Sequence, residues 1–457
     1  MLRVQGDHIV TADGTDVRLR GVGIGGFLHL ENFINGYPGI GHELQEVMAN
    51  EDFFSRMRDH FFGEDDVAFI KATGANTIRL PLNYRLFEND EGYQRVDHVV
   101  EWCERHGLYV ILDAHAVPGW QNTDWSSDNA TGRALLWKET HFQDRYIAWW
   151  ESLAERYRAS DTVAGYDLLN EPVANAPPSG GFDKTHYRPG WDAINRLYRR
   201  TVDAIRAIDP DHIIFIEGDG YSERFSGLDA PFTENLVYSS HCYSAAGFGP
   251  GPYPSETWNA ERQRRDFLES EGVRFARKHG VPLWVGEFGA VYNGPAQEID
   301  ARLRALQDQL SLFESEGVHW TLWTYKDCGV LGWVTLDPSS PYMQLTERIR
   351  KAKLDLDTDF WLHWVPAPPF RSERQQLAAK MLELVDNVEM SRDAHATHVA
   401  LALSTYAGAL LQPAYAALFR DLSDRELDDV LSSFRLGQCV PNERLIEVVR
   451  EATTASS

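Results

Sequence analysis

Eight short runs of apolar, β-branched and aromatic residues alternate with stretches of helical character along most of this chain. Near-continuous apolar runs are typical of parallel strands that are buried on both faces, and parallel neighbours need a crossover helix between them. Eight such units favour a closed (β/α)8 barrel, the TIM barrel, over an open sheet. The predicted strands are residues 18–24, 76–80, 109–114, 163–169, 212–217, 236–241, 283–287 and 319–324.

The 457 residues leave a long segment after the last of these strands. From about residue 354 the strand pattern gives way to the i, i+3, i+4 apolar spacing of helices, and three prolines between residues 364 and 370 predict a connecting segment. We therefore predict a barrel over residues 1–353 and a helical C-terminal extension over residues 354–457. The expected helices of the extension are residues 375–388, 394–410 and 424–435.

Two smaller features leave alternatives open. Residues 4–17 predict a β-hairpin that turns at Asp13-Gly14, which would either plug the barrel floor or form a simple edge ribbon. The apolar stripe in residues 394–410 suits packing against the barrel, and it would equally suit self-association into a homo-oligomer.

Charge and cysteine content exclude some classes of partner and compartment. The formal net charge of −24, from 44 basic and 68 acidic residues, argues against nucleic acid, because phosphate backbones require a basic surface. The four cysteines lie far apart without a CxxC pair, which predicts neither a zinc site nor a disulfide framework. No apolar stretch is long enough to span a membrane, and the first residues lack the basic and apolar regions of a signal peptide. A cytoplasmic location is the expectation, unless a leader has been removed.

Polar residues are concentrated where the predicted strands end, and in a parallel barrel these ends form the active site. Most of them, taken singly, have an ordinary structural explanation. Glu171 and Glu287 differ, because each follows a nearly uncharged apolar run and burying a carboxylate costs free energy unless it is paired or used. Two carboxyl groups about 5 Å apart suit a double displacement at a sugar, whereas about 6.5–9.5 Å leaves room for water and gives inversion. We predict the shorter spacing.

Seven motifs, one for each of seven predicted strands and in the correct order, resemble glycoside hydrolase family 5 over roughly residues 1–350. The resemblance implies a β-glycosidase that retains configuration, with Glu171 as general acid/base and Glu287 as nucleophile. It also implies sugar-binding or positioning roles for Arg79, His115, Asn170, His241, Tyr243 and Trp323. The motifs are GVGIGGFLHLENF, GANTIRLPLNYR, LDAHAVPGWQN, YDLLNEPV, YSSHCYS, WVGEFGA and WTLWTYKD.

These roles imply two steps through a covalent glycosyl-enzyme, with no metal or organic cofactor. We expect the negative charge of Glu287 to raise the pKa of Glu171, and we expect a bell-shaped dependence of the rate on pH. The segment around Glu31, which departs from typical cellulases of the family, is expected to cap the barrel rather than to touch the sugar.

Long loops after the third, fourth and sixth strands, residues 115–133, 173–190 and 244–256, favour a pocket rather than an open cleft. We therefore expect exo action or short β-glycoside substrates, with Trp120, Trp125 and Trp258 either as pocket walls or as loop packing. Other interpretations stay open: an endo-acting β-glucanase or mannanase, a glycolipid glycosidase, a transglycosylase, or a sugar-binding barrel without catalysis. Neither the sugar nor the linkage follows from these patterns.

Overall fold

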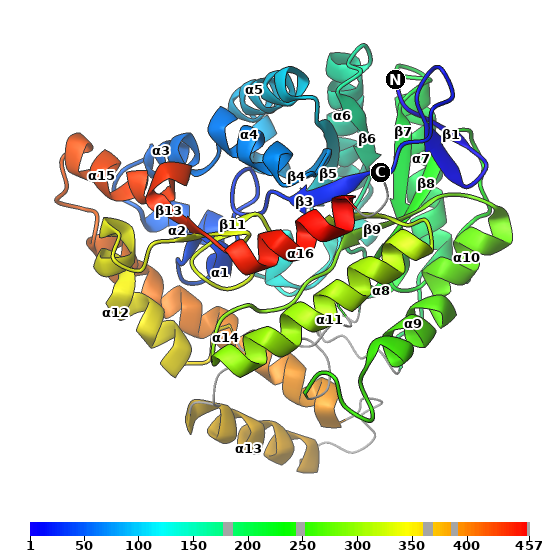
Figure 1. Cartoon of the computed structure of the whole chain (residues 1–457). Coiled ribbons are helices and arrows are strands. Elements are labelled where there is room, and N and C mark those ends of the chain that lie inside the picture. Colours follow the sequence, from blue (N-terminus) through cyan, green and yellow to red (C-terminus); the bar gives the residue numbers. More distant parts are fainter. Residues whose placement is uncertain (177–185, 244–251, 360–368, 385–391, 455–457) are drawn as a thin grey trace.

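A closed barrel of eight parallel strands forms the centre of the molecule (Figure 1). The computed structural model describes residues 1–176, 186–243, 252–359, 369–384 and 392–454. The strand order around the barrel is β10, β3, β4, β5, β6, β7, β8 and β9, and each predicted strand overlaps one of these, which confirms the TIM barrel. Their bounds are β3 Arg20–Gly23, β4 Thr77–Asn83, β5 Tyr109–Ala116, β6 Val163–Asp167, β7 Ile213–Glu217, β8 Leu236–His241, β9 Leu283–Glu287 and β10 His319–Leu322.

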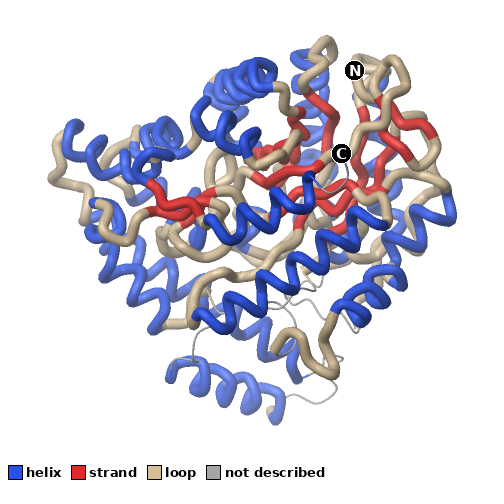
Figure 2. Tube along the Cα trace, viewed as in Figure 1, coloured by secondary structure: helices blue, strands red, loops and turns tan. Residues whose placement is uncertain are grey.

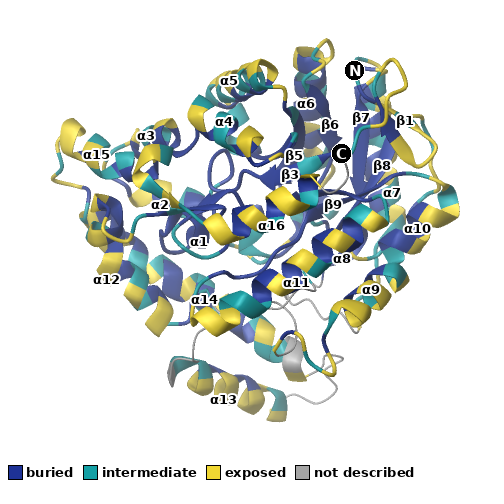
Figure 3. Cartoon of the chain, viewed as in Figure 1, coloured by how far each residue is buried: buried dark blue, intermediate teal, exposed yellow. Residues whose placement is uncertain are grey.

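Helices surround the barrel, so that the strands are buried on both faces (Figures 2 and 3). Glycines end some of them: Gly107 after α5 and Gly280 after α10 adopt left-handed φ values of 65° and 61°. The helices are α1 Asn32–Asn35, α2 Gly41–Val47, α3 Phe53–Phe61, α4 Glu64–Ala72, α5 Glu91–His106, α6 Thr140–Tyr157, α7 Trp191–Arg206, α8 Asp219–Ser222, α9 Ala260–Glu269, α10 Glu271–His279, α11 Ala296–Ser315 and α12 Pro341–Asp355.

The N-terminal segment turns at Asp13-Gly14 as predicted: Val10 and Asp16 form an antiparallel bridge, and the backbone N–H of Val17 donates to the carbonyl of Ile9 at 2.8 Å. An additional, unpredicted turn joins β1 (Arg3–Gln5) to β2 (His8–Val10), which pair antiparallel. Leu2 and Ile9 pack with residues of the barrel strands, including Trp284, in a small buried cluster. This packing favours the plug over the edge ribbon, because it fills one end of the barrel with apolar side chains.

The C-terminal extension is helical, and it packs closely on the barrel. Three of its helices overlap the three predicted ones: α13 (Pro369–Glu383), α14 (Arg392–Ala417) and α15 (Asp424–Leu431). Most of the proline-rich connection lies outside the described residues, as do residues 360–368 and 385–391 as a whole. Two further elements escaped prediction, strand β13 (Cys439–Pro441) and helix α16 (Glu443–Thr454).

Strand β13 pairs antiparallel with β12 (Val334–Leu336), which pairs in turn with β11 (Lys326–Asp327). Helix α16 packs against α11 on the outside of the barrel. Residues 439–454 are therefore part of the shell around the barrel. All four cysteines are free, and none of the helices within the described residues is long and apolar enough to cross a membrane.

Candidate active site

Arg79, in the middle of β4, is the charged centre of the site. Its side chain is fully buried, and its guanidinium contacts carboxyl groups from four other strands. The nitrogen-to-oxygen distances are 3.2 Å to Asp113, 2.9 Å to Asp167, 3.0 Å to Glu217 and 2.5 Å to Glu287. The barrel thus brings four acidic residues around one fixed positive charge.

The four carboxyl groups do not share the same charge state. Burial raises the pKa of Asp113 and of Asp167 well above the ordinary value, so both are held in the neutral form. Burial also acts on Glu217, but the positive charges of His241 and Arg79 outweigh it and bring its pKa to about 2. Two neutral acids and two ionised carboxylates therefore surround the guanidinium, which limits the buried negative charge.

Glu287 ends strand β9 and is held by two hydrogen bonds. Arg79 Nη1 donates to its Oε1, and the hydroxyl of Tyr243 donates to its Oε2 at 2.8 Å. Burial alone would raise its pKa, but the positive charges of His241 and Arg79 overcome that effect, and the pKa lies below the ordinary value. Glu287 is an ionised, oriented carboxylate at neutral pH.

Glu171 follows β6 in a strained backbone conformation, with φ at +47°. Its backbone N–H donates to Glu217 Oε2 at 2.7 Å, and His241 Nδ1 donates to its Oε1 at 2.8 Å. The pKa of Glu171 is raised to about 7, and burial is the main cause. The charge of Glu287 adds to this rise, but it is a smaller cause, so the expectation that Glu287 dominates is corrected.

His241 links the two glutamates. Burial would lower the pKa of its imidazole, but the charges of Glu217 and Glu287 and its hydrogen bond to Glu171 raise it well above the ordinary value. Carboxylate oxygens of Glu171 and Glu287, together with a ring nitrogen of His241, all lie within 4.8 Å of one another. The nearest oxygens of the two glutamates are therefore closer than the ~6.5–9.5 Å between the carboxyl groups of inverting glycosidases, which agrees with the predicted double displacement.

An aromatic platform lies beside the two glutamates. Trp323, just after β10, stacks on His115 with ring planes 4° apart and centroids 5.5 Å apart. A Cβ at Gly23 or Gly25 would approach the Trp323 ring to 2.6 or 2.7 Å, which explains why the first strand and its continuation are glycine-rich. His115 Nδ1 lies 2.7 Å from Asp113 Oδ2, so its Nε2 is the nitrogen left for other partners.

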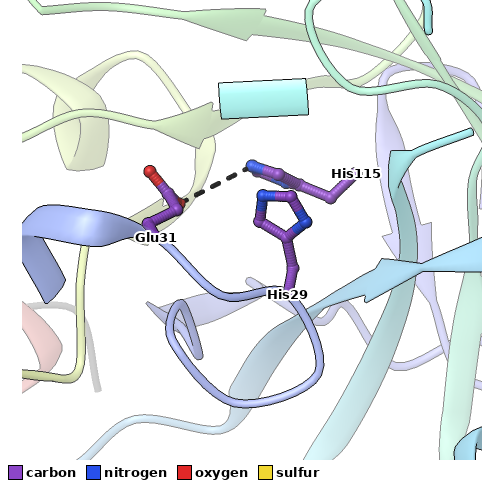
Figure 4. Close-up of side chains that lie close together, drawn as sticks. All are labelled: His29, Glu31 and His115. Carbon is purple, nitrogen blue, oxygen red and sulfur yellow. Dashed lines mark ion pairs between the residues drawn. The ribbon is translucent and has the colours of Figure 1, made fainter. Parts of the chain in front are cut away.

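His29, Glu31 and His115 form a second buried group (Figure 4). One donor atom of each lies within 4.8 Å of the others, so the three could hold a divalent cation as well as hydroxyl groups. Within the described residues, Glu31 Oε1 and both ring nitrogens of His29 have no hydrogen-bond partner. Glu31 lines the central cavity, so the expectation that its segment only caps the barrel is wrong.

A cavity of about 280 Å³ opens above these groups. Trp125 lines it, whereas Trp120 and Trp258 do not: the Trp120 indole donates to the carbonyl of Asp128 at 2.9 Å, and Trp258 is buried elsewhere. Parts of the other two long loops, 177–185 and 244–251, lie outside the described residues. The lining residues are Glu31, Phe33, His115, Asp124, Trp125, Ser126, Glu171, Tyr221, Tyr243, Glu287, Trp323, Leu331, Thr397 and Leu401.

The remaining predicted residues lie close behind this lining. Asn170 Oδ1 accepts from Arg79 at 2.8 Å, and its amide nitrogen lies 3.4 Å from His115 Nε2. Sequence reasoning missed Glu217, which binds Arg79 and the Glu171 backbone, although it ends an apolar strand as Glu287 does. It also missed Tyr221 in α8, whose hydroxyl donates to Asp124 at 2.6 Å, because no strand-end signal marks that position.

Comparisons with known proteins agree with this geometry. The profile of the Cellulase family (glycosyl hydrolase family 5) matches residues 48–329. A β-xylosidase of Phanerodontia chrysosporium is 35% identical over 490 residues, covering 98% of both chains. A probable glucan 1,3-beta-glucosidase A of Emericella nidulans is 27% identical, over 69% of this chain and 87% of that one.

Among solved structures, an endogalactoceramidase superposes with a TM-score of 0.53 at 20% identity, covering 72% of this chain and 75% of that one. This likeness concerns the fold. The family match spans more than half of the chain, and the xylosidase aligns along nearly all of it. The chain belongs to glycoside hydrolase family 5 and is a retaining β-glycoside hydrolase.

Proposed function

We propose that this enzyme is an exo-acting β-glycosidase that removes one terminal sugar at a time through a covalent glycosyl-enzyme. The observation that carries the proposal is the cavity of about 280 Å³ with Glu171 and Glu287 in its lining. Its volume is just below the ~300–1,000 Å³ typical of small-molecule sites, which suits one sugar and the start of its leaving group. A polymer cleaved internally would need a longer groove.

In the first step, Glu287 attacks the anomeric carbon while Glu171 donates its proton to the departing glycosidic oxygen. The lowered pKa of Glu287 keeps the nucleophile ionised, and the pKa of about 7 keeps Glu171 substantially protonated at neutral pH. Arg79 and Tyr243 hold one oxygen each of Glu287, which fixes its direction of attack. The products are a glycosyl ester on Glu287 and a free alcohol.

In the second step, Glu171 takes a proton from water, and the water oxygen displaces Glu287 from the anomeric carbon. The charge on Glu287 is neutralised in the ester, which lowers the pKa of Glu171 and favours its action as a base. Trp323 would support the sugar ring, and Glu31 and His115 would bind its hydroxyl groups. The net result is two displacements and a sugar of unchanged anomeric configuration.

β-Xylosides are the first substrates to test. The support is the β-xylosidase of Phanerodontia chrysosporium, which aligns along 98% of this chain, including the C-terminal extension. A panel of p-nitrophenyl β-glycosides and short β-linked oligosaccharides would identify the sugar, and product analysis would show whether single sugars are released. Internal cleavage of a polymer or glycolipid, with all small glycosides inert, would contradict exo action.

Replacing Glu171 with alanine tests its role as acid/base. The kcat/KM for an oligosaccharide should fall ~10²–10⁴-fold, because its alkoxide leaving group needs a proton. With a 2,4-dinitrophenyl glycoside the loss in kcat/KM should be much smaller, and added azide should give the β-glycosyl azide. Glu261→Ala, at an exposed position on α9, is the control. Equal losses for both leaving groups would exclude a proton-donating role.

A plot of kcat/KM against pH should be bell-shaped. Activity should fall as the pH rises through about 7, because Glu171 loses its proton, and fall below the lowered pKa of Glu287, because the nucleophile becomes protonated. With a 2,4-dinitrophenyl glycoside the alkaline limb should disappear, since this leaving group departs without a proton. An unchanged alkaline limb would assign it to another group.

A further inference from the structure

Helix α14 of the C-terminal extension contributes two residues to the cavity, Thr397 and Leu401. They are four positions apart and therefore lie on the same face of the helix. Thr397 is exposed and Leu401 is half-buried, so both stand at the outer part of the cavity. The helix lies beyond residues 48–329, where the family profile matches, so this wall belongs to the extension.

The C-terminal half of α14 is fixed to the segment that follows β3. Gly408 packs so closely that a Cβ there would lie 2.7 Å from the Gly39 Cα. One turn later, Gln412 Nε2 lies 3.3 Å from the carbonyl oxygen of Pro38 and 3.0 Å from that of Ile40, and it donates to both. Side chains on the first half of the helix are thereby held at a defined position.

A second attachment joins α14 to α12, which follows β10. The hydroxyls of Tyr415 and Tyr342 are 2.7 Å apart and buried, and Tyr342 also donates to the carbonyl of Asn35 at 2.7 Å. Helix α14 thus rests on segments that follow the first and the last strands of the barrel (Figure 1).

The order of the strands shows on which side of the cavity α14, with Thr397 and Leu401, lies. Glu171 follows β6 and Glu287 ends β9, so one arc of the barrel between them carries β7 and β8, and the other carries β10, β3, β4 and β5. The sugar-binding groups Trp323, Glu31 and His115 lie on the second arc. With its anomeric carbon at Glu171 and Glu287, a sugar stacked on Trp323 would extend along that arc, and its leaving group would depart over the first arc.

We propose that α14 closes the cavity beyond the non-reducing end of the bound sugar, so that Leu401 and Thr397 exclude a second sugar there and restrict cleavage to single terminal residues. This inference rests on the proposed exo function and assigns it to particular side chains. Leu401 stands with Phe33 and Leu331 in the lining, and these three offer no hydrogen-bonding group. Hydroxyls of a second sugar would lose water there without compensation.

The test is a double variant, Thr397→Ala with Leu401→Ala, in the full-length enzyme. Its substrates are p-nitrophenyl β-glycosides of the cleaved sugar and of its β-linked disaccharide, and chromatography separates intact disaccharide from monosaccharide. We expect the ratio of kcat/KM for intact disaccharide release to that for the monosaccharide glycoside to rise about 10-fold, the scale of small changes in an apolar pocket. Leu410→Ala, at a 61% exposed leucine on the same helix, should leave the ratio unchanged.

A complementary variant fills the same space. Thr397→Trp, at an exposed position, should raise the KM for the monosaccharide glycoside at least several-fold with less effect on kcat, because the entrance narrows while Glu171 and Glu287 stay in place. A wild-type ratio in the double variant, together with an unchanged KM in Thr397→Trp, would overturn the role of α14. Release of intact disaccharide by the wild-type enzyme as its main product would instead refute the exo function itself.

Discussion

Replacing Glu287 with alanine should lower kcat on every substrate by a factor on the order of 10⁴–10⁶, the scale seen when a catalytic nucleophile is removed. The loss is large because Glu287 is the only carboxylate with a lowered pKa among the described residues that line the cavity. The ionised Glu217 lies outside this lining and is bound by Arg79, Ser222 and the Glu171 backbone. External azide should partly restore the reaction with an activated aryl glycoside. The product should be the α-glycosyl azide, because azide would attack once from the face that Glu287 occupied.

The anomeric configuration of the azide product identifies which catalytic role has been removed. Nuclear magnetic resonance distinguishes α-glycosyl azide from β-glycosyl azide, so the Glu287→Ala and Glu171→Ala variants should give opposite anomers. A β-azide from Glu287→Ala, or a residual kcat within tenfold of wild type, would show that another group is the nucleophile. Thermal unfolding of both variants checks that the barrel is intact.

Replacing Arg79 with methionine should lower the free energy of unfolding by ~3–5 kcal/mol, the usual cost of removing one partner from a buried ion pair. The guanidinium contacts four carboxyl groups, and the fully buried Glu217 and the ionised Glu287 would keep His241 but lose the second of their two neighbouring positive charges. Surviving enzyme should show an acid limb of kcat/KM moved to higher pH, because the pKa of Glu287 rises without Arg79. Chemical denaturation and a pH profile measure the two effects.

Arg156→Met is the matched control for Arg79→Met. Arg156 forms a bidentate ion pair with Asp97, but both side chains are about two-fifths exposed. Its removal should cost at most ~1 kcal/mol, the value typical of exposed pairs, and leave the pH profile unchanged. Equal losses in the two variants would mean that Arg79 acts as an ordinary packing residue.

The barrel was predictable because its strands are buried on both faces and therefore carry an unbroken apolar signal. Glu171 and Glu287 stood out because each interrupts or ends such a run. The pKa of Glu171 was harder to explain, since sequence shows which charges are near but not how thoroughly water is excluded. Burial proved the larger cause.

Contacts between distant segments were the least predictable part of the site. Nothing local in residues 394–410 indicates that Leu401 would line the cavity, because its apolar spacing equally suits a helix packed anywhere. The role of Glu31 was equally hard to predict, because it depends on the segment after β3 lying next to His115 in the folded barrel. Strand β13 is too short for a periodic signal and exists through its pairing with β12.

That pairing has a consequence for how the protein is made. A ribosome releases the barrel strands first, but β12 gains its partner β13 only when residues 439–441 emerge, and α16 covers α11 later still. Thr453 donates to the carbonyl of Thr73, joining two residues that emerge far apart in time. The nascent barrel therefore stays incompletely covered until residues 439–454 have emerged, and its exposed apolar surface needs chaperones most during that interval.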